Sequence, residues 1–293
     1  MNEIHIDALL PAEMAVRAEQ IGVRKAEMPA LPMFTLAVLA GAFISLGSIF
    51  ATTVSAGSMI TTAPGGQVIS SAALPYGITR LLSGLVFCLG LILVVVGGAE
   101  LFTGNNLIVM AWAGGRVGTG SVLRSWALVY AGNFAGGLGV ALAAYGAGLH
   151  EAGGGAFGAS ALGIAAEKLR PGFGQAVVLG VLGNVLVCLA VWLSYSARST
   201  ADRILAVVPP IAAFVAAGFE HSVANMYFVP FALLVAHLDP GFVAARGADV
   251  HVLTWSAFLV RNLLPVTIGN MLGGAGLVGG VYWFVYLRPR ARD

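Results

Sequence analysis

The sequence alternates long apolar runs with short polar stretches over most of its length. Six of these runs are long enough to cross a lipid bilayer, for which about 20 helical residues suffice. They cover residues 33–56, 77–111, 122–147, 173–196, 204–237 and 252–286. The pattern therefore predicts an all-α membrane protein with six transmembrane helices.

The second and fifth apolar runs are longer than one crossing needs, and polar residues interrupt both. Glu100 and the stretch from Thr103 to Asn106 interrupt the second, and the stretch from Glu220 to Asn225 interrupts the fifth. An irregular turn at membrane depth is tolerated only where it lines a cavity or is buried in protein. We therefore predict that the second and fifth helices are broken into halves.

The two interruptions share one sequence pattern. Each reads glycine, one residue, glutamate, four residues, asparagine, starting at Gly98 and at Gly218. A second match follows, because residues 124–137 and 261–274 are identical at six of fourteen positions. The chain thus contains two copies of one unit, residues 31–150 and 170–288. With three spans each, the copies must face opposite ways, which is the inverted repeat of many transporters.

Composition and charge agree with a membrane protein and set its orientation. Hydrophobic residues make up 58% of the chain and charged residues 10%, and the mean hydropathy is +0.90. A net charge of +2 with scattered basic residues gives no reason to expect nucleic acid as a partner. If both termini are cytoplasmic, the inner segments hold ten basic residues and the outer ones five. This asymmetry predicts cytoplasmic termini.

The segments outside the apolar runs are predicted more coarsely. Residues 1–30 form a cytoplasmic tail in which residues 5–20 are either an amphipathic helix on the membrane surface or a frayed end. Residues 57–75 form a polar loop, and residues 148–171 form the longest hydrophilic connection. Residues 31–288 form the transmembrane domain, and residues 289–293 form a cytoplasmic tail.

Four motifs carry a resemblance to a known family. They are Ala-Glu-Leu-Phe-Thr-Gly-Asn (99–105), Gly-Asn-Val-Leu-Val-Cys-Leu-Ala-Val-Trp (183–192), Gly-Phe-Glu-His-Ser-Val-Ala-Asn-Met (218–226) and Pro-Val-Thr-Ile-Gly-Asn (265–270). In these stretches the chain resembles the formate/nitrite transporter family over about residues 30–288. The resemblance implies an aquaporin-like protomer, a homopentamer in the cell inner membrane with one pore per subunit, and transport of small monovalent anions without a cofactor or metal.

The resemblance also implies roles for particular residues, carried over motif by motif. His221 looks like the central histidine, Leu101 and Thr103 look like pore-lining residues of the broken second helix, and Lys168 looks like a lysine of the outer vestibule. The hydrophobic constrictions correspond to Phe87, Leu91, Val187 and Phe214. Polar residues close to the pore, or holding its broken helices, correspond to Asn184, Asn225, Asn270 and Glu220. The outer loops depart from the family, which leaves the vestibule and the substrate preference open.

Physical chemistry suggests what the histidine does. A carboxylate moved into a dry pore costs several kcal/mol even after relaxation, so it needs a proton or a proton donor. Histidine is the side chain whose ordinary pKa lies nearest neutrality. We therefore expect the anion to meet His221 and Thr103 between apolar constrictions and to cross as the neutral acid or as a transient ion pair, with protons as the second partner.

A purely structural role stays open at each position. In that case His221 makes its hydrogen bonds within helix contacts, the Thr103 hydroxyl bonds its own backbone, and Lys168 is a solvated charge in a loop. Glu100 and Glu220 are expected to be structural, accepting hydrogen bonds from the opened backbone amides, because a negative charge facing the pore would repel anions. Asn105 and Asn225 have the same interpretation.

Two other classes of function are disfavoured. An intramembrane enzyme using Glu220 and His221 is not expected, because adjacent helical residues point about 100° apart and neither a His-Glu-x-x-His nor a Gly-x-Ser-x-Gly motif occurs. A neutral-solute pore of aquaporin type would need asparagine-proline-alanine turns, and Asn106 and Met226 follow Asn105 and Asn225 instead. The sequence therefore predicts an anion transporter, formate first, with nitrite, hydrosulfide or a short monocarboxylate as the alternative.

Overall fold

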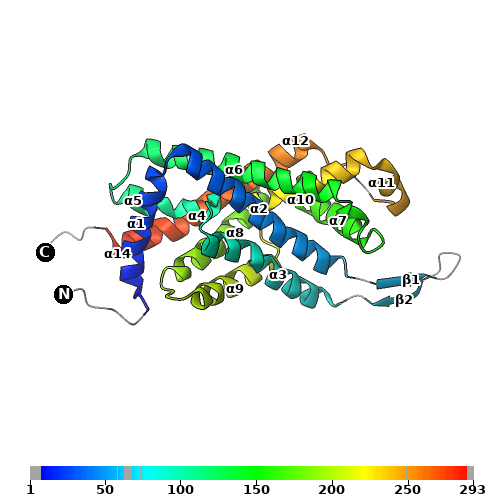
Figure 1. Cartoon of the computed structure of the whole chain (residues 1–293), viewed down its shortest axis with the longest axis horizontal. Coiled ribbons are helices and arrows are strands. Elements are labelled where there is room, and N and C mark those ends of the chain that lie inside the picture. The colour runs from blue at the N-terminus through cyan, green and yellow to red at the C-terminus, as the bar shows by residue number, and fades with distance from the viewer. Residues whose placement is uncertain (1–7, 58, 63–67, 73, 249, 289–293) are drawn as a thin grey trace.

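The computed structural model describes residues 8–57, 59–62, 68–72, 74–248 and 250–288 (Figure 1). The elements of the first half are α1 (Pro11–Glu27), α2 (Ala30–Ser55), β1 (Met59–Thr62), β2 (Val68–Ala72), α3 (Tyr76–Gly97), α4 (Phe102–Asn105), the 3-10 turn η1 (Asn106–Ile108), α5 (Val109–Ala113) and α6 (Thr119–Gly146). Those of the second half are the 3-10 turn η2 (Leu149–Glu151), α7 (Ala156–Leu169), α8 (Phe173–Ser194), α9 (Thr200–Ala216), α10 (Ser222–Leu238), α11 (Pro240–Arg246), α12 (Trp255–Ala257), η3 (Phe258–Leu263), α13 (Leu264–Met271), η4 (Leu272–Gly280) and α14 (Val281–Tyr286). The predicted tail 289–293 lies outside the described residues.

The helices confirm the membrane protein that the apolar runs predict. Within the described residues, five helices are long and apolar enough to cross a bilayer, namely α2, α3, α6, α8 and the continuous helix from Trp255 to Tyr286. A sixth span results if α10 and α11, which are bent by 97°, are counted together. Many large apolar side chains on these helices are exposed, for example Leu81, Leu123 and Leu277. Such a surface suits contact with lipid.

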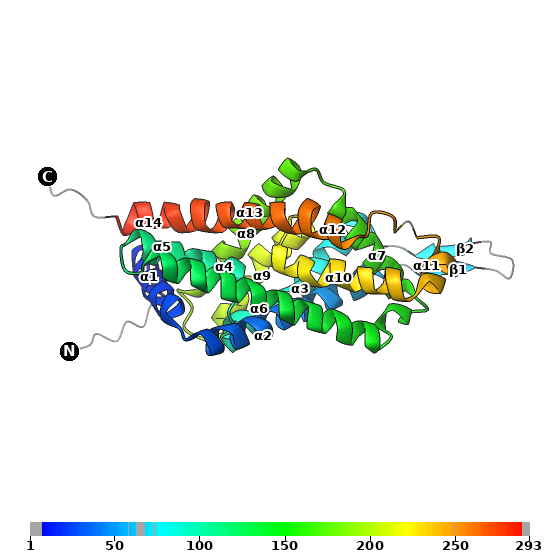
Figure 2. The same ribbon diagram turned by 90° about the horizontal axis from the view of Figure 1, so that it is seen from above.

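Helices α2, α3, α6 and α10 run roughly along the long axis of the molecule (Figures 1 and 2). Helices α1, α5 and α14 lie at one end, which we call the α1 end. The β1–β2 hairpin, α7 and α11 lie at the opposite end, which we call the hairpin end (Figure 2). The amphipathic segment is therefore a helix rather than a frayed end, but it begins at Pro11 and ends at Glu27.

Two connections differ from the sequence prediction. The segment predicted as a polar loop over 57–75 contains an antiparallel hairpin, in which Met59 pairs with Ala72 and Ile60 with Ser71. The hydrophilic connection 148–171 contains helix α7, whose buried residues Phe157, Ala161 and Ala165 pack on the helical body. Small apolar residues at helical spacing in this stretch were the signal for a helix.

Close helix contacts through glycine organise the membrane domain. Helix α2 packs against α3 and α6, and α8 packs against α9 and α13. Gly136 of α6 lies so close to α2 that an added Cβ would overlap the backbone oxygen of Val38, and a Cβ on Gly41 would overlap the backbone of Asn133. Backbones approach this closely in membranes only where residues are small.

This contact gives a testable prediction with a control on the same helix. Gly136→Ala should destabilise the protein by about 1–3 kcal/mol, since overpacking forces backbone shifts. Gly139→Ala, on the exposed side of α6 with open space around it, should be neutral or stabilising, because alanine favours helix. Thermal unfolding of both variants in detergent measures the difference. Equal melting temperatures would contradict the close contact.

Candidate functional site

The two interrupted apolar runs form two matching helix breaks near the middle of the molecule. Helix α3 ends before Gly98, which has a φ of 75°, and α4 begins at Phe102. Helix α9 is followed by Gly218, with a φ of 77°, and α10 begins at Ser222. Both glycines adopt the left-handed conformation that only glycine adopts at little cost. This lets the chain turn out of one helix and into the next within a few residues.

One asparagine holds each break by the same set of hydrogen bonds. Asn133 Oδ1 accepts from Phe102 N at 2.9 Å, and its Nδ2 donates to Ala37 O at 2.7 Å and Glu100 O at 2.9 Å. Its buried side chain thereby satisfies two backbone groups that the break leaves unpaired, Phe102 N and Glu100 O, and ties them to Ala37 in α2.

Asn270 repeats this arrangement at the second break. Its Oδ1 accepts from Ser222 N at 2.9 Å, and its Nδ2 donates to Gly180 O at 2.8 Å and Glu220 O at 3.1 Å. The backbone amide of Glu100 donates to Leu36 O, and that of Glu220 donates to Leu179 O, both at 3.2 Å. The two breaks therefore share one pattern of hydrogen bonds.

The two glutamates correct one sequence prediction. We expected them to accept hydrogen bonds from opened backbone amides. Instead, Glu100 accepts from Lys25 Nζ at 2.8 Å and from Asn105 Nδ2 at 2.7 Å. The backbone amides at the breaks donate to asparagine side-chain oxygens and to backbone carbonyl oxygens. The glutamate carboxylates therefore accept hydrogen bonds from lysine ammonium groups and asparagine side-chain amides instead.

Glu220 has the corresponding partners at the hairpin end. It accepts from Lys168 Nζ at 3.0 Å and from Asn225 Nδ2 at 2.6 Å. Only 15% of the Lys168 side chain is exposed, and its ammonium also lies 5.3 Å from the ring centre of Phe228. The interpretation of Lys168 as a solvated loop charge is therefore wrong.

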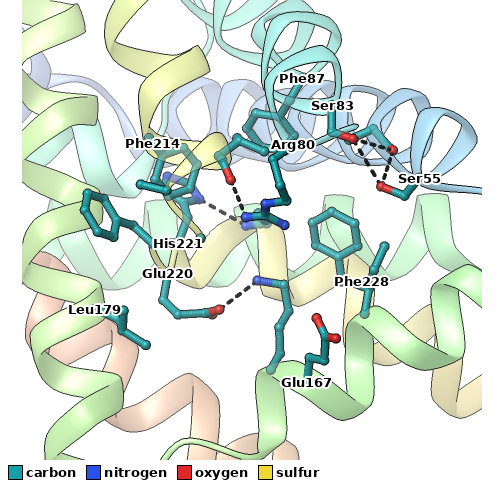
Figure 3. A pocket seen from close by; sticks show the side chains of 18 of the residues that line it. Ser55, Arg80, Ser83, Phe87, Glu167, Leu179, Phe214, Glu220, His221 and Phe228 are labelled. Atoms are coloured by element: carbon teal, nitrogen blue, oxygen red, sulfur yellow. Dashed lines mark hydrogen bonds and ion pairs between the residues drawn. The ribbon is translucent and has the colours of Figure 1, made fainter. Parts of the chain in front are cut away.

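Two cavities flank the breaks. The hairpin-end cavity is about 340 Å³ and is lined by residues that include Arg80, Phe87, Lys168, Phe214, Glu220 and His221 (Figure 3). The α1-end cavity is about 190 Å³ and is lined by residues that include Lys25, Leu91, Glu100, Leu101, Asn105 and Val191. Each cavity thus contains one lysine–glutamate pair.

His221 lines the hairpin-end cavity, whereas Thr103 lines neither cavity and lies between Leu101 and Gly104, which line the α1-end cavity. Thr103 Oγ1 lies 2.9 Å from His221 Nε2, and both residues are almost completely buried. His221 Nδ1 accepts a hydrogen bond from Ala224 N at 3.1 Å and so caps the start of α10. Because Nδ1 is the acceptor, the ring proton is on Nε2, and Nε2–H donates to Thr103.

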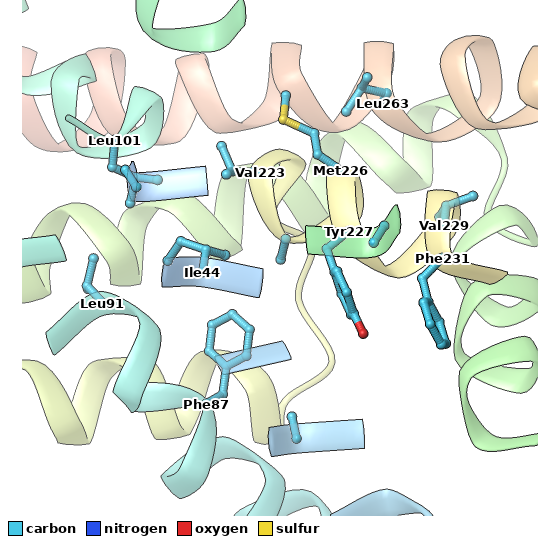
Figure 4. Close-up of a cluster of buried hydrophobic side chains, with 14 of the residues drawn as sticks. Ile44, Phe87, Leu91, Leu101, Val223, Met226, Tyr227, Val229, Phe231 and Leu263 are labelled. Atoms are coloured by element: carbon cyan, nitrogen blue, oxygen red, sulfur yellow. The ribbon is translucent and has the colours of Figure 1, made fainter. Parts of the chain in front are cut away.

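Apolar side chains surround this hydrogen bond. The rings of Phe87 and Phe214 meet edge to face with centres 6.1 Å apart, and Phe214 lies 5.9 Å from the His221 ring. Leu91 and Leu101 belong to the same buried cluster (Figure 4). Val187 is also buried, but it lines neither cavity. Of the predicted constriction residues, Phe87 and Phe214 thus line the hairpin-end cavity with His221, Leu91 lines the α1-end cavity, and Val187 lies in the buried core.

Three asparagines lie at the helix breaks rather than on the cavity walls. Asn184 Nδ2 donates to Asn270 O at 2.7 Å and to Asn106 Oδ1 at 3.0 Å, which ties α8 to both breaks. Asn184 and Asn270 line neither cavity, and neither does Asn225. Of the two roles predicted for them, holding the breaks fits the hydrogen bonds, whereas lining the pore does not.

Sequence reasoning missed three residues of this region. Lys25 lies in the predicted tail, outside the repeated motif, so nothing in the motif indicated that it pairs with Glu100. Asn133 occupies the repeat position of Asn270, and that correspondence was the signal that could have identified it. Arg80 donates to the backbone oxygens of Val215 and Ala216 at the end of α9 and lines the hairpin-end cavity.

The fold and site together define an integral membrane protein with two cavities that each contain a lysine–glutamate pair. The family model described as formate/nitrite transporter matches residues 12–284. The formate channel FocA of Escherichia coli K12 is 43% identical over 286 residues, covering 96% of both chains. A probable formate transporter of Methanothermobacter thermautotrophicus is 35% identical, covering 95% of this chain and 97% of the relative. The chain belongs to the formate/nitrite transporter family.

Solved structures agree with this assignment. A structure described as a pentameric formate channel with formate bound matches with a TM-score of 0.78 at 40% identity, covering 88% of this chain and 98% of that one. A structure described as an FNT family ion channel matches with a TM-score of 0.71 at 27% identity, covering 94% and 98%. These relatives are named as channels or transporters, which argues against the intramembrane enzyme.

Proposed function

We propose that the protein transports formate across the cell inner membrane, through a path that runs between the two cavities past His221. The single observation that carries this proposal is the His221–Thr103 hydrogen bond, because it joins His221 in the wall of the hairpin-end cavity to the segment whose residues Leu101 and Gly104 line the α1-end cavity. The names of the relatives favour formate as the substrate. Nitrite, hydrosulfide or a short monocarboxylate is the alternative for the same path.

The two lysines are proposed to attract the anion from either side. Lys168 and Lys25 each reach into a cavity, where they meet Glu220 and Glu100. The carboxylates hold the ammonium groups in place and prevent anions from binding too tightly. Attraction of this kind falls with ionic strength, because salt screens exposed charges beyond about 10 Å at 0.1 M.

His221 is proposed to give formate the proton that it needs to cross. The Ala224 N–H bond to Nδ1 favours the neutral ring, because a protonated Nδ1 could not accept it. A proton from water converts the ring to imidazolium only when an anion is present to compensate the charge. Transfer of that proton to formate gives formic acid and restores the cap. The acid then crosses and releases its proton in the opposite cavity.

Two architectural proposals accompany the function. The halves 31–150 and 170–288 are proposed to be inverted repeats with broken second and fifth helices, which the matched bonding of Asn133 and Asn270 supports. The protein is further proposed to be a homopentamer with cytoplasmic termini, which the pentameric relative and the ten-to-five distribution of basic residues support. Mass measurement of the complex in native detergent tests the pentamer.

Flux into proteoliposomes tests the transport function. Formate, nitrite, hydrosulfide and lactate should be compared side by side at several pH values and salt concentrations. We expect formate to enter fastest, with an accompanying change of internal pH, and the flux to fall as salt is raised. Empty liposomes report the passive leak of each acid. Formate flux no faster than this leak would overturn the proposal, and faster nitrite flux would favour the alternative substrate.

A further inference from the structure

A cluster of possible metal ligands lies at the hairpin end, away from the transport path. It consists of His150 and Glu151 in η2, directly after α6, and Asp239, between α10 and α11. One ligand atom from each side chain lies within 4.8 Å of the other two. None of the three lines either of the two cavities at the helix breaks.

The histidine ring is buried and held in a fixed orientation. His150 is 6% exposed. Its ring stacks on Tyr145, with centres 5.1 Å apart and planes 13° apart, and it meets the edge of Phe242 at 5.4 Å. Its Nδ1 has no hydrogen-bond partner among the described residues. The ring therefore points Nε2 toward the carboxylates without being held by a hydrogen bond at its other nitrogen.

The carboxylates are positioned to complete a ligand set. Asp239 Oδ1 accepts from Phe242 N at 2.9 Å and caps α11. The second oxygen, Oδ2, faces His150 Nε2 at 3.3 Å. Glu151 Oε1 lies 4.0 Å from the same nitrogen, on a side chain that is 75% exposed and free to adjust.

The distance between His150 Nε2 and Asp239 Oδ2 fits neighbouring metal ligands better than a charged hydrogen bond. Charge-assisted N–H···O bonds are about 2.7–2.9 Å long. Ligands about 2.0–2.1 Å from a tetrahedral zinc ion are roughly 3.4 Å apart, since the edge of a tetrahedron is about 1.63 times the centre-to-corner distance. The 3.3 Å separation matches this edge, and a small movement of Glu151 brings the third ligand to it.

We propose that His150, Glu151 and Asp239 form a binding site for a zinc-like divalent cation at the hairpin end. One imidazole nitrogen and two carboxylate oxygens are ligands that zinc accepts, and water fills the fourth position. Calcium and magnesium are disfavoured, because they prefer sites made of oxygen alone. The ion joins the end of α6 to the corner between α10 and α11, two segments far apart in the sequence. No metal motif in the sequence predicted this site.

Titration of the purified, tag-free pentamer with Zn²⁺ by calorimetry tests the proposal. The tag must be removed because polyhistidine itself binds zinc. We expect one Zn²⁺ per protomer, with affinity at least about tenfold weaker in His150→Phe, which keeps the aromatic stack and removes both nitrogens. Glu151→Gln should weaken binding less. His251→Phe is the control, because it removes an exposed histidine outside the cluster.

Two further measurements make the result independent of transport and of folding defects. Co²⁺ in place of Zn²⁺ should give the visible absorption of a tetrahedral site in the wild type and not in His150→Phe. Zn²⁺ should raise the melting temperature of the wild type and of His251→Phe, but not that of His150→Phe. Equal Zn²⁺ affinity in the wild type and in His150→Phe, or no binding up to millimolar Zn²⁺, would overturn the proposal.

Discussion

Replacing His221 with asparagine should reduce formate flux into proteoliposomes by about 100-fold or more, the range that a positioned proton donor contributes. Asparagine can accept the Ala224 N–H bond and is a strong N-cap residue, so α10 should start normally. It cannot exchange a proton. The variant therefore separates the structural role of His221 from its proposed chemical role.

Two additional variants complete this experiment. His221→Phe removes both the cap and the proton, so it should lose flux and also some stability, about 1 kcal/mol for a lost cap. His237→Phe, in the same helix but outside both cavities, should transport formate like the wild type. Formate-coupled internal acidification that persists undiminished in His221→Asn would rule out proton transfer by this histidine.

Replacing Asn270 with leucine should prevent assembly of a stable protein. The change removes the bonds to Ser222 N, Gly180 O and Glu220 O, and it leaves the two groups at the break, Ser222 N and Glu220 O, unpaired. Each unpaired buried group costs about 1–3 kcal/mol, so leaving two of them unpaired should cost roughly 2–6 kcal/mol. Thermal unfolding of the detergent-solubilised complex, followed by size exclusion, measures the effect.

The repeat provides a matched test of the same idea. Asn133→Leu should be about as damaging, because Asn133 makes the corresponding three bonds at the first break. Thr267→Val, one turn before Asn270 on α13, loses only a part-buried hydroxyl that bonds Leu263 O and Tyr130. It should cost about 1 kcal/mol. An Asn270→Leu variant as stable as Thr267→Val would show that this asparagine does not hold the break.

Sequence patterns predicted the membrane-spanning helices well, because these depend on local chemistry. A run of about 20 apolar residues has few alternatives to a membrane helix, since lipid leaves its backbone no other partners. Glu100 and Glu220 within such runs marked the interruptions for the same reason. The hairpin between α2 and α3 and the helix α7 were missed, because their short polar or small-residue patterns are compatible with several local structures.

The sequence by itself determined the membrane class and the formate/nitrite transporter family, whose motifs contain His221 and Thr103, and it predicted two related halves. Only the tertiary structure decided which side chains bond to which. In the structure, Lys25 pairs with Glu100, and the backbone amides at the two breaks donate to Asn133, Asn270 and two carbonyl oxygens. The tertiary structure also brings Asp239 to His150. Such contacts join residues tens of positions apart, and hydrophobic periodicity reports only which face of a helix is buried, never which distant side chain meets it there.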